Sequence, residues 1–455
     1  MKKYDSIIIG AGQAGPSLSA HLAAKGEKVA IVEGHKFGGT CVNYGCTPTK
    51  TLVASARAAH MARRGADFGV MIPGEIQIDM KKVKARKDEQ VNKSSRGVEN
   101  WLKNTPNLDV YEAYAQFESA HTLRVGDKIL EADKFFLNVG GHPRVLDHVK
   151  TARYLTNRTI LDLEEVPEHL IVIGGSYIGL EFGQMFRRFG SKVTIIEMGS
   201  RLVSREDEAV SLEIQKILEN EGIQLRLDAE CIQATMEGDQ VLVDVECKEG
   251  EPKIRGSHVL VAIGRIPNTA NLGLDKAGVA VNERGFIEVD DHLRTSVPHI
   301  WALGDCNGQG AFTHTAYNDY EIVADHLAGG NRKVSDRILC YGLYVDPPLA
   351  RIGMNEAQAK ASGRKILKGY RPMTKVSRAR EKGEDQGFMQ VLVDADTEQI
   401  LGATILGIGG DEIIHSLLDV KYAQKPYTLV SNAVHIHPTV SELIPTMLQG
   451  LQPLE

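Results

Sequence analysis

The stretch Ser6-Ile7-Ile8-Ile9-Gly10-Ala11-Gly12-Gln13-Ala14-Gly15, near the start of the chain, decides the fold. Its apolar run predicts a strand over residues 6–9, and a helix is expected over about residues 17–25, after the glycine turn. A second strand is expected over residues 29–33, ending at Glu33. Gly10, Gly12 and Gly15 allow a tight turn and a close approach to a pyrophosphate, and a carboxylate such as Glu33 can bind a ribose hydroxyl. The stretch therefore predicts a nucleotide-binding β-α-β unit.

A second unit of the same kind begins with the strand expected over residues 170–173. The chain turns at Gly174-Gly175-Ser176-Tyr177-Ile178-Gly179, and a helix to Phe189 and a strand over residues 193–197 are expected to follow. Ser176 stands where the pattern usually has its middle glycine, which loosens the expected approach of a pyrophosphate. Glu197 ends the strand, where it would repel an adenosine 2′-phosphate, so NADH is favoured over NADPH. Arg201 and Arg205 follow closely and would soften that preference.

Two cysteines lie close together in the segment Gly38-Gly39-Thr40-Cys41-Val42-Asn43-Tyr44-Gly45-Cys46-Thr47-Pro48-Thr49-Lys50. In a straight helix their Cα atoms would be about 8.6 Å apart. That exceeds the roughly 7 Å that a disulfide can span. Gly45 and Pro48 can distort the helix enough to close a strained, reducible bridge, which suits catalysis. Half of a zinc site is the alternative, but no second cysteine pair exists to complete it, and no metal site is predicted.

The composition, 42% apolar and 25% charged, is that of an ordinary globular protein, and 455 residues predict about three domains. A net charge of −6 gives no attraction for phosphate backbones, so no nucleic-acid partner is expected. No apolar run reaches the about 18 residues of a membrane span, and the N-terminus does not resemble a secretory signal. Six cysteines do not look like a secreted disulfide framework. A cytoplasmic location without membrane contact is expected.

The rest of the chain gives a coarse outline. Helices are expected from about Thr49 and over Met80–Lys103, and short alternating strands over residues 111–139. Residues 231–248 predict a hairpin that turns at Gly238-Asp239. From Asp336 the glycine turns cease, and a helix near residues 355–361, a hairpin across 387–407 and a helix near 411–423 indicate an α+β region.

Taken in order, these motifs resemble those of the class I pyridine nucleotide-disulfide oxidoreductases, the family of dihydrolipoamide dehydrogenase, glutathione reductase and mercuric reductase. The resemblance covers essentially the whole chain. Besides the two turns and the cysteine segment, it rests on residues 262–268 (AIGRIPN), 300–305 (IWALGD) and 435–442 (HIHPTVSE).

The resemblance implies an α/β fold with two Rossmann-like nucleotide-binding domains, for FAD and NAD, plus a C-terminal α+β dimerisation domain. The FAD domain is expected over residues 1–150 and again over 267–335, the NAD domain over 151–266, and the dimerisation domain over 336–455. The family also implies a homodimer, in which His437 serves the disulfide of the other subunit.

Roles for single residues follow from the same resemblance. Cys46 would lie against the flavin, and Cys41 would exchange with substrate. Lys50 and Glu181 would pair beside the flavin N5, Tyr177 would cover the nicotinamide pocket, and Asp305 would bind the ribityl chain. His437, oriented by Glu442, would be the acid/base group. The other cofactor-binding residues implied are Gly39, Thr40, Ala115, Gly140, Gly264 and Arg265.

Departures from the family pattern leave the substrate open. Thr47, Thr49, Tyr44 and Asn138 replace residues usual in the family and change the polarity near the disulfide. His437 with Glu442, and a C-terminal tail without cysteines, favour a disulfide or dithiol substrate. The alternatives are reduction of a metal ion (Hg or Cu) or another oxidant, as in mercuric reductase, and service as a redox subunit of a larger complex. Nucleotide transhydrogenation without thiols is disfavoured because such relatives lack the cysteine pair.

Overall fold

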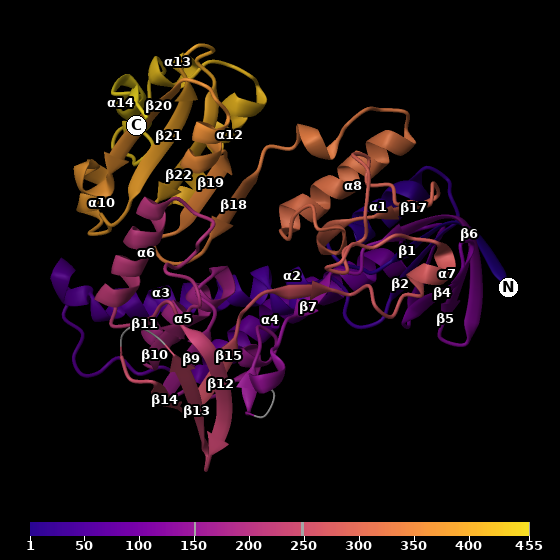
Figure 1. Ribbon diagram of the computed structural model, residues 1–455, viewed down its shortest axis with the longest axis horizontal. Helices are drawn as coiled ribbons and strands as arrows, with labels where there is room; N and C mark the ends of the chain where they lie inside the picture. The colour runs from indigo at the N-terminus through magenta and orange to yellow at the C-terminus, as the bar shows by residue number, and fades with distance from the viewer. Residues whose placement is uncertain (150–151, 247–249, 455) are drawn as a thin grey trace.

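The computed structural model describes residues 1–149, 152–246 and 250–454, which form two nucleotide-fold units and a C-terminal sheet domain (Figure 1). The first unit has a seven-stranded sheet in the order β3-β2-β1-β6-β5-β4, and β17 pairs with β6. Side chains of β1 alternate between faces: Ile7 packs with Phe117 on one side, and Ile8 packs with Leu18 on the other. The strands are β1 (Lys2–Ile9), β2 (Val29–Glu33), β3 (Leu108–Glu112), β4 (Ala115–Ser119), β5 (Thr122–Val125), β6 (Lys128–Leu137) and β17 (Ile300–Ala302).

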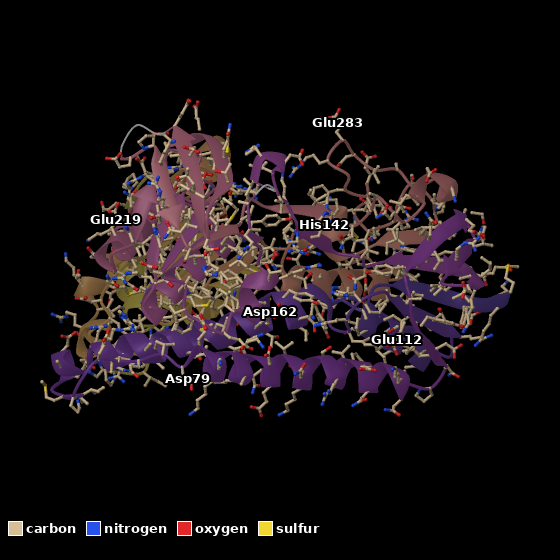
Figure 2. All side chains as sticks on the ribbon, turned by 90° about the horizontal axis from the view of Figure 1, so that it is seen from below. Asp79, Glu112, His142, Asp162, Glu219 and Glu283 are labelled. Atoms are coloured by element: carbon tan, nitrogen blue, oxygen red, sulfur yellow. The ribbon has the colours of Figure 1, made fainter. Side chains whose placement is uncertain are left out.

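Helices surround this sheet. Figure 2 shows α4 running along the outside of the molecule from Asp79, whose side chain accepts a hydrogen bond from the Lys82 backbone N–H at 3.0 Å and so caps the helix. The helix expected from about Thr49 already begins at Cys46. The helices are α1 (Gly15–Ala24), α2 (Gly39–Tyr44), α3 (Cys46–Arg63), α4 (Met80–Lys103), α7 (Leu274–Ala277) and α8 (Thr313–Leu327).

The second unit has a five-stranded parallel sheet in the order β11-β10-β9-β15-β8. The expected hairpin is present as β12 and β13, which β14 joins in a separate antiparallel sheet. Residues 247 and 248 of that prediction lie outside the described residues. Its elements are β8 (Tyr154–Leu155), β9 (His169–Ile173), α5 (Tyr177–Phe189), β10 (Lys192–Ile196), α6 (Glu208–Asn220), β11 (Gln224–Arg226), β12 (Glu230–Glu237), β13 (Gln240–Glu246), β14 (Lys253–Gly256) and β15 (His258–Val261).

The chain passes between the two units twice, once along β7 (Gly141–Pro143) and once along β16 (Arg265–Pro267). These two strands pair antiparallel. After β16 the chain returns to the first sheet as β17, which lies parallel to β6. The first unit is therefore built from two separate parts of the chain, with the second unit inserted between them.

The C-terminal domain has a six-stranded sheet in the order β18-β19-β22-β21-β20-β23. The expected hairpin is formed by β21 and β22, both fully buried. The single helix expected near residues 411–423 is divided into α11 and α12 at Ile414. The elements are β18 (Cys340–Leu343), β19 (Leu349–Gly353), α9 (Glu356–Ala361), β20 (Ile366–Pro372), α10 (Ser377–Glu381), β21 (Phe388–Asp394), β22 (Ile400–Leu406), α11 (Gly410–Ile413), α12 (His415–Tyr422), α13 (Thr428–Ser431), α14 (Leu443–Gln449) and β23 (Gln452–Pro453). The α/β fold with a C-terminal α+β domain is thus confirmed. In the described parts of the chain, every helix is too short or too polar to cross a bilayer.

Candidate active site

The glycine turn after β1 is as tight as its sequence predicts. Gly10 has a φ of +104°, and a Cβ built there would lie 2.3 Å from the carbonyl oxygen of Asn138. A Cβ on Gly39 would lie 2.8 Å from the Cα of Gly12, so the start of α2 packs on the turn. Glu33 at the end of β2 accepts a hydrogen bond from the Ala11 backbone N–H at 2.8 Å. The turn and its carboxylate are therefore adjacent.

The turn after β9 repeats this geometry. Gly174 has a φ of +115°, and its Cβ would lie 2.5 Å from the carbonyl oxygen of Ala262. Glu197, directly after β10, accepts a hydrogen bond from the Gly175 backbone N–H at 2.6 Å. Ser176 is the residue before α5. Serine in the middle position is therefore compatible with the same tight turn. The remaining predicted residues of this turn, Ile178 and Gly179, lie in the first turn of α5.

The two cysteines lie on either side of a break between helices. Cys41 is in α2 and Cys46 is the first residue of α3, with Gly45 between the helices. A Cβ on Gly45 would lie 3.0 Å from the Thr40 carbonyl oxygen, so the break brings the backbone back toward Cys41. This is the distortion that the sequence predicts. Both cysteines are free thiols in this structure.

The thiol pair is electrostatically asymmetric. A hydrogen bond from Cys41, one from Thr313 and the positive charge of Lys50 lower the pKa of Cys46 to about 6, against the opposing effect of burial. The same hydrogen bond to Cys46, together with burial, raises the pKa of Cys41. Cys46 is therefore the thiolate of the pair and Cys41 holds the proton, as the N-terminal position of Cys46 in α3 also favours.

Thr313 is a residue that the sequence analysis missed. Its hydroxyl lies 3.2 Å from the sulfur of Cys46, at the start of α8. Nothing in the local sequence relates the two residues, because they are brought together by the packing of distant segments.

Lys50 and Glu181 form the predicted ion pair, with Nζ 2.8 Å from the carboxylate. Glu181 is buried and also accepts a hydrogen bond from the Tyr344 backbone N–H at 2.9 Å. The Lys50 ammonium group lies 4.6 Å from the centre of the Tyr344 ring. The pair therefore joins α3, α5 and the segment after β18 beside the thiols.

Arg265 and Asp305 form a second ion pair, with Nε 3.6 Å from the carboxylate. Arg265 also donates hydrogen bonds to the Thr40 hydroxyl, at 3.4 Å, and to the Gly141 carbonyl oxygen. Burial raises the pKa of Asp305, although Arg265 opposes the shift. Gly140 and Gly264 both have positive φ and would have open space in front of a Cβ. Ala115 is buried at the start of β4.

His437 lies on the loop between α13 and α14 of the C-terminal domain. Its Nδ1 is 2.9 Å from the carboxylate of Glu442, as predicted, and its side chain is 76% exposed. Two neighbouring apolar side chains, Val434 and Ile436, are also exposed. The imidazole is thus oriented by Glu442 and presented outward, with its Nε2 free to face another molecule.

Known proteins share this organisation along the whole chain. The model for pyridine nucleotide-disulphide oxidoreductases matches residues 4–319, and the model for the dimerisation domain of that family matches residues 340–448. The probable pyridine nucleotide-disulfide oxidoreductase RclA of Escherichia coli K12 is 37% identical over 453 residues, with 97% of this chain and 98% of the relative covered. A dihydrolipoyl dehydrogenase of Cupriavidus necator is 32% identical, with 97% of each covered.

Solved structures share the fold of this chain. The Cu(II) complex of the HOCl-induced flavoprotein disulfide reductase RclA from E. coli superposes with a TM-score of 0.90 at 35% identity, over 99% of each chain. LpdA of Mycobacterium tuberculosis, at 23% identity and a TM-score of 0.88, has the same fold.

The residues fit the cofactors that these similarities indicate. The turn at Gly10 leaves no room for a side chain, Glu33 stands beside it, and a second such turn at Gly174 has its own carboxylate, as FAD and a pyridine nucleotide require. When bound, FAD supplies two-electron transfer between the nicotinamide and the cysteine pair. The chain is therefore an FAD-dependent enzyme, and it belongs to the pyridine nucleotide-disulphide oxidoreductase family.

Proposed function

We propose that the enzyme transfers an electron pair from NADH to a disulfide substrate through Cys41 and Cys46, as part of a cytoplasmic homodimer. The observation that carries the proposal is the asymmetric thiol pair, in which Cys46 is the thiolate and Cys41 keeps its proton. Reduction of the Cys41–Cys46 disulfide by two electrons and one proton yields this state. Cys41 must then lose its proton before it can attack a disulfide.

The exposed imidazole of His437 is the group proposed to take that proton, in the active site of the partner subunit. Cys41 would attack one substrate sulfur and release the other as a thiolate, which His437 protonates. Cys46 would then attack Cys41, which restores the disulfide and releases the second substrate sulfur as a thiolate that takes its proton from solvent. Glu442 holds Nδ1, so Nε2 is the nitrogen that exchanges the proton.

His437→Ala tests this step. We expect turnover with the best disulfide from a panel to fall by about 10²- to 10⁴-fold, the usual contribution of a general acid–base group. Flavin reduction by NADH, resolved by anaerobic stopped-flow absorbance, should be unchanged because it precedes contact with His437. His435→Ala, which removes a neighbouring, half-buried histidine, is the matched control. Normal disulfide turnover in the His437 variant would exclude the proposed mechanism.

We also propose that NADH is preferred over NADPH. Glu197 lies at the second turn, where its carboxylate would meet a 2′-phosphate. Repulsion between this carboxylate and the 2′-phosphate should cost on the order of 1–3 kcal/mol, which lowers kcat/KM for NADPH about 5- to 150-fold relative to NADH. Arg201 and Arg205 would reduce the ratio. Equal kcat/KM values for the two nucleotides would show that Glu197 does not read the ribose.

Reduction of Cu(II) is the second candidate. It is favoured by the similarity to E. coli RclA, of which a Cu(II) complex has been solved. A metal ion accepts electrons from thiolate ligands and gains little from a nearby imidazolium. Anaerobic NADH oxidation with Cu(II) should therefore survive His437→Ala, whereas disulfide reduction should not. That contrast separates the two candidates in one variant.

A further inference from the structure

Glu206 is a completely buried carboxylate between β10 and α6, with three hydrogen-bond donors around it. One oxygen, Oε1, accepts from the Tyr177 hydroxyl at 2.9 Å and from the Tyr341 hydroxyl at 2.6 Å. The other, Oε2, accepts from Arg351 at 2.7 Å. Arg351 also contacts Asp207 at 3.3 Å. Glu206 is therefore fixed by Arg351 on one side and shared between two phenols on the other.

The two phenols belong to an aromatic cluster beside the thiols. Tyr177 begins α5, directly after the second glycine turn, and its ring centre lies 5.7 Å from that of Tyr341 and 6.3 Å from that of Phe312. Phe312 and Tyr341 are stacked, with ring centres 5.4 Å apart and planes 4° apart. Phe312 immediately precedes Thr313, which contacts Cys46. Tyr177 therefore lies between the nucleotide turn and the redox centre.

Both phenols act as donors to the same oxygen. Burial, together with the negative charge of Glu206, raises the pKa of Tyr177 and of Tyr341, so both hydroxyls stay protonated. A carboxylate oxygen has a lone pair for each of two donors, but it holds each less strongly than it would hold one alone, because each donor draws electron density from the shared oxygen and the two positive hydroxyl hydrogens repel each other. Tyr341 thereby weakens the bond between Glu206 and Tyr177.

We propose that Glu206 is a positioning residue that latches Tyr177 over the nicotinamide site, and that Tyr341 loosens the latch by competing for Oε1. The inference rests on the placement of Tyr177 at that site. A nicotinamide that approaches the flavin must displace the Tyr177 ring and break its bond to Glu206. The strength of that bond therefore subtracts from the affinity for the pyridine nucleotide.

Two conservative changes should shift nucleotide affinity in opposite directions. Tyr177→Phe removes the latch but keeps the ring, and the dissociation constant for NAD⁺ should fall by about 10- to 150-fold, the usual effect of one hydrogen bond to a charged group. Tyr341→Phe keeps the stack on Phe312 but gives Oε1 entirely to Tyr177, so the dissociation constant should rise by about 2- to 5-fold. Both values can be measured by calorimetry on the oxidised holoenzyme.

Tyr370→Phe is the matched control, since Tyr370 is an exposed tyrosine of β20 that packs on Phe388. The affinity of this variant for NAD⁺ should equal that of the wild-type enzyme. A merely structural role would weaken binding in both variants, because each loses a buried hydrogen bond. Weaker binding in both, or no change in either, would overturn the proposal. At low NADH concentration, flavin reduction should be faster than wild type in Tyr177→Phe and slower than wild type in Tyr341→Phe. These measurements involve no electron acceptor, so failure of the latch is distinguishable from failure of the proposed disulfide substrate.

Discussion

Cys46 has its low thiol pKa because neighbours from three elements stabilise the thiolate. Cys41 donates from α2, Thr313 donates from the start of α8, and Lys50 adds a positive charge one turn along α3. Burial alone would push the pKa the other way. The redox centre therefore stores its negative charge on a defined sulfur, and each neighbour can be removed separately.

We expect Cys46→Ser to abolish the long-wavelength charge-transfer absorbance of the two-electron-reduced enzyme. That absorbance requires a thiolate against the flavin, and a serine hydroxyl stays neutral at the same position. The flavin should remain bound, since the FAD turn is untouched. Anaerobic titration with NADH checks this directly, and a band that persists would mean that Cys46 is not the thiol beside the flavin.

Thr313→Ala should raise the pKa of Cys46 by about one to two pH units, because a hydrogen bond to the charged form is lost. The thiolate exists above its pKa, which lies at about 6 in the wild type. As the pH is lowered, the charge-transfer absorbance should therefore be lost at a higher pH in the variant than in the wild type. Thr313→Ser, which keeps the hydroxyl, should restore the wild-type midpoint. An unmoved midpoint in the alanine variant would show that the Thr313 hydroxyl does not stabilise the thiolate.

Sequence predicts those residues whose partners are near in the chain or belong to a repeated motif. The cysteines, Gly45 and Lys50 lie in a single segment, and the structure places them as expected. Thr313 beside Cys46 and Tyr341 beside Glu206 were not predicted. The first contact joins the two separate parts of the first unit, and the second joins the C-terminal domain to the second unit. No periodicity or spacing in the sequence relates either pair.

At the scale of elements, the two glycine turns are equivalent in geometry but separate in position. A Cβ at Gly10 or at Gly174 would lie within 2.5 Å of a carbonyl oxygen, and both residues have positive φ. The apolar runs and the glycine patterns that follow them were enough to predict both turns. The ends of helices were less predictable: α3 begins earlier than expected, because Gly45 rather than Pro48 ends the preceding helix.

Gly10→Ala and Gly174→Ala should therefore remove different cofactors. Each change adds a clash and a left-handed side chain worth at least about 1–2 kcal/mol, which weakens the local site by about 10-fold or more. Gly10→Ala should be purified with less flavin, measured by visible absorbance. Gly174→Ala should keep its flavin but require more NADH to reduce it. Loss of flavin in the Gly174 variant would contradict the assignment of the two turns.

At the scale of the whole molecule, the exposed apolar side chains around His437 indicate where the second subunit binds. Val434 is 100% exposed and Ile436 is 80% exposed, in a domain that matches the dimerisation domain of the family. Apolar surface of this kind is normally covered by a partner. In the mechanism proposed above, dimer formation would bring His437 to the thiols of the partner subunit.

Val434→Asp should weaken the dimer by about 100-fold or more, because an unpaired charge buried at an interface costs about 3–5 kcal/mol. Analytical ultracentrifugation should show monomers, and disulfide turnover should fall with the loss of dimer. Val281→Asp, at an exposed valine of the first unit, is the control and should leave the dimer intact. A dimer that resists Val434→Asp would place the interface elsewhere.

The pairing of β17 with β6 also orders events during synthesis. The first sheet cannot be completed until the ribosome has passed Ile300, whereas the parallel sheet between Tyr154 and Val261 is contiguous and can form earlier. Until then the edge of β6, including Phe135 and Phe136, has no strand to cover it. Pairing between strands so distant in sequence is slow, and it leaves an unpaired, apolar strand edge exposed in the growing chain. The first unit is therefore expected to finish folding after the second, whose sheet is complete once Val261 has emerged.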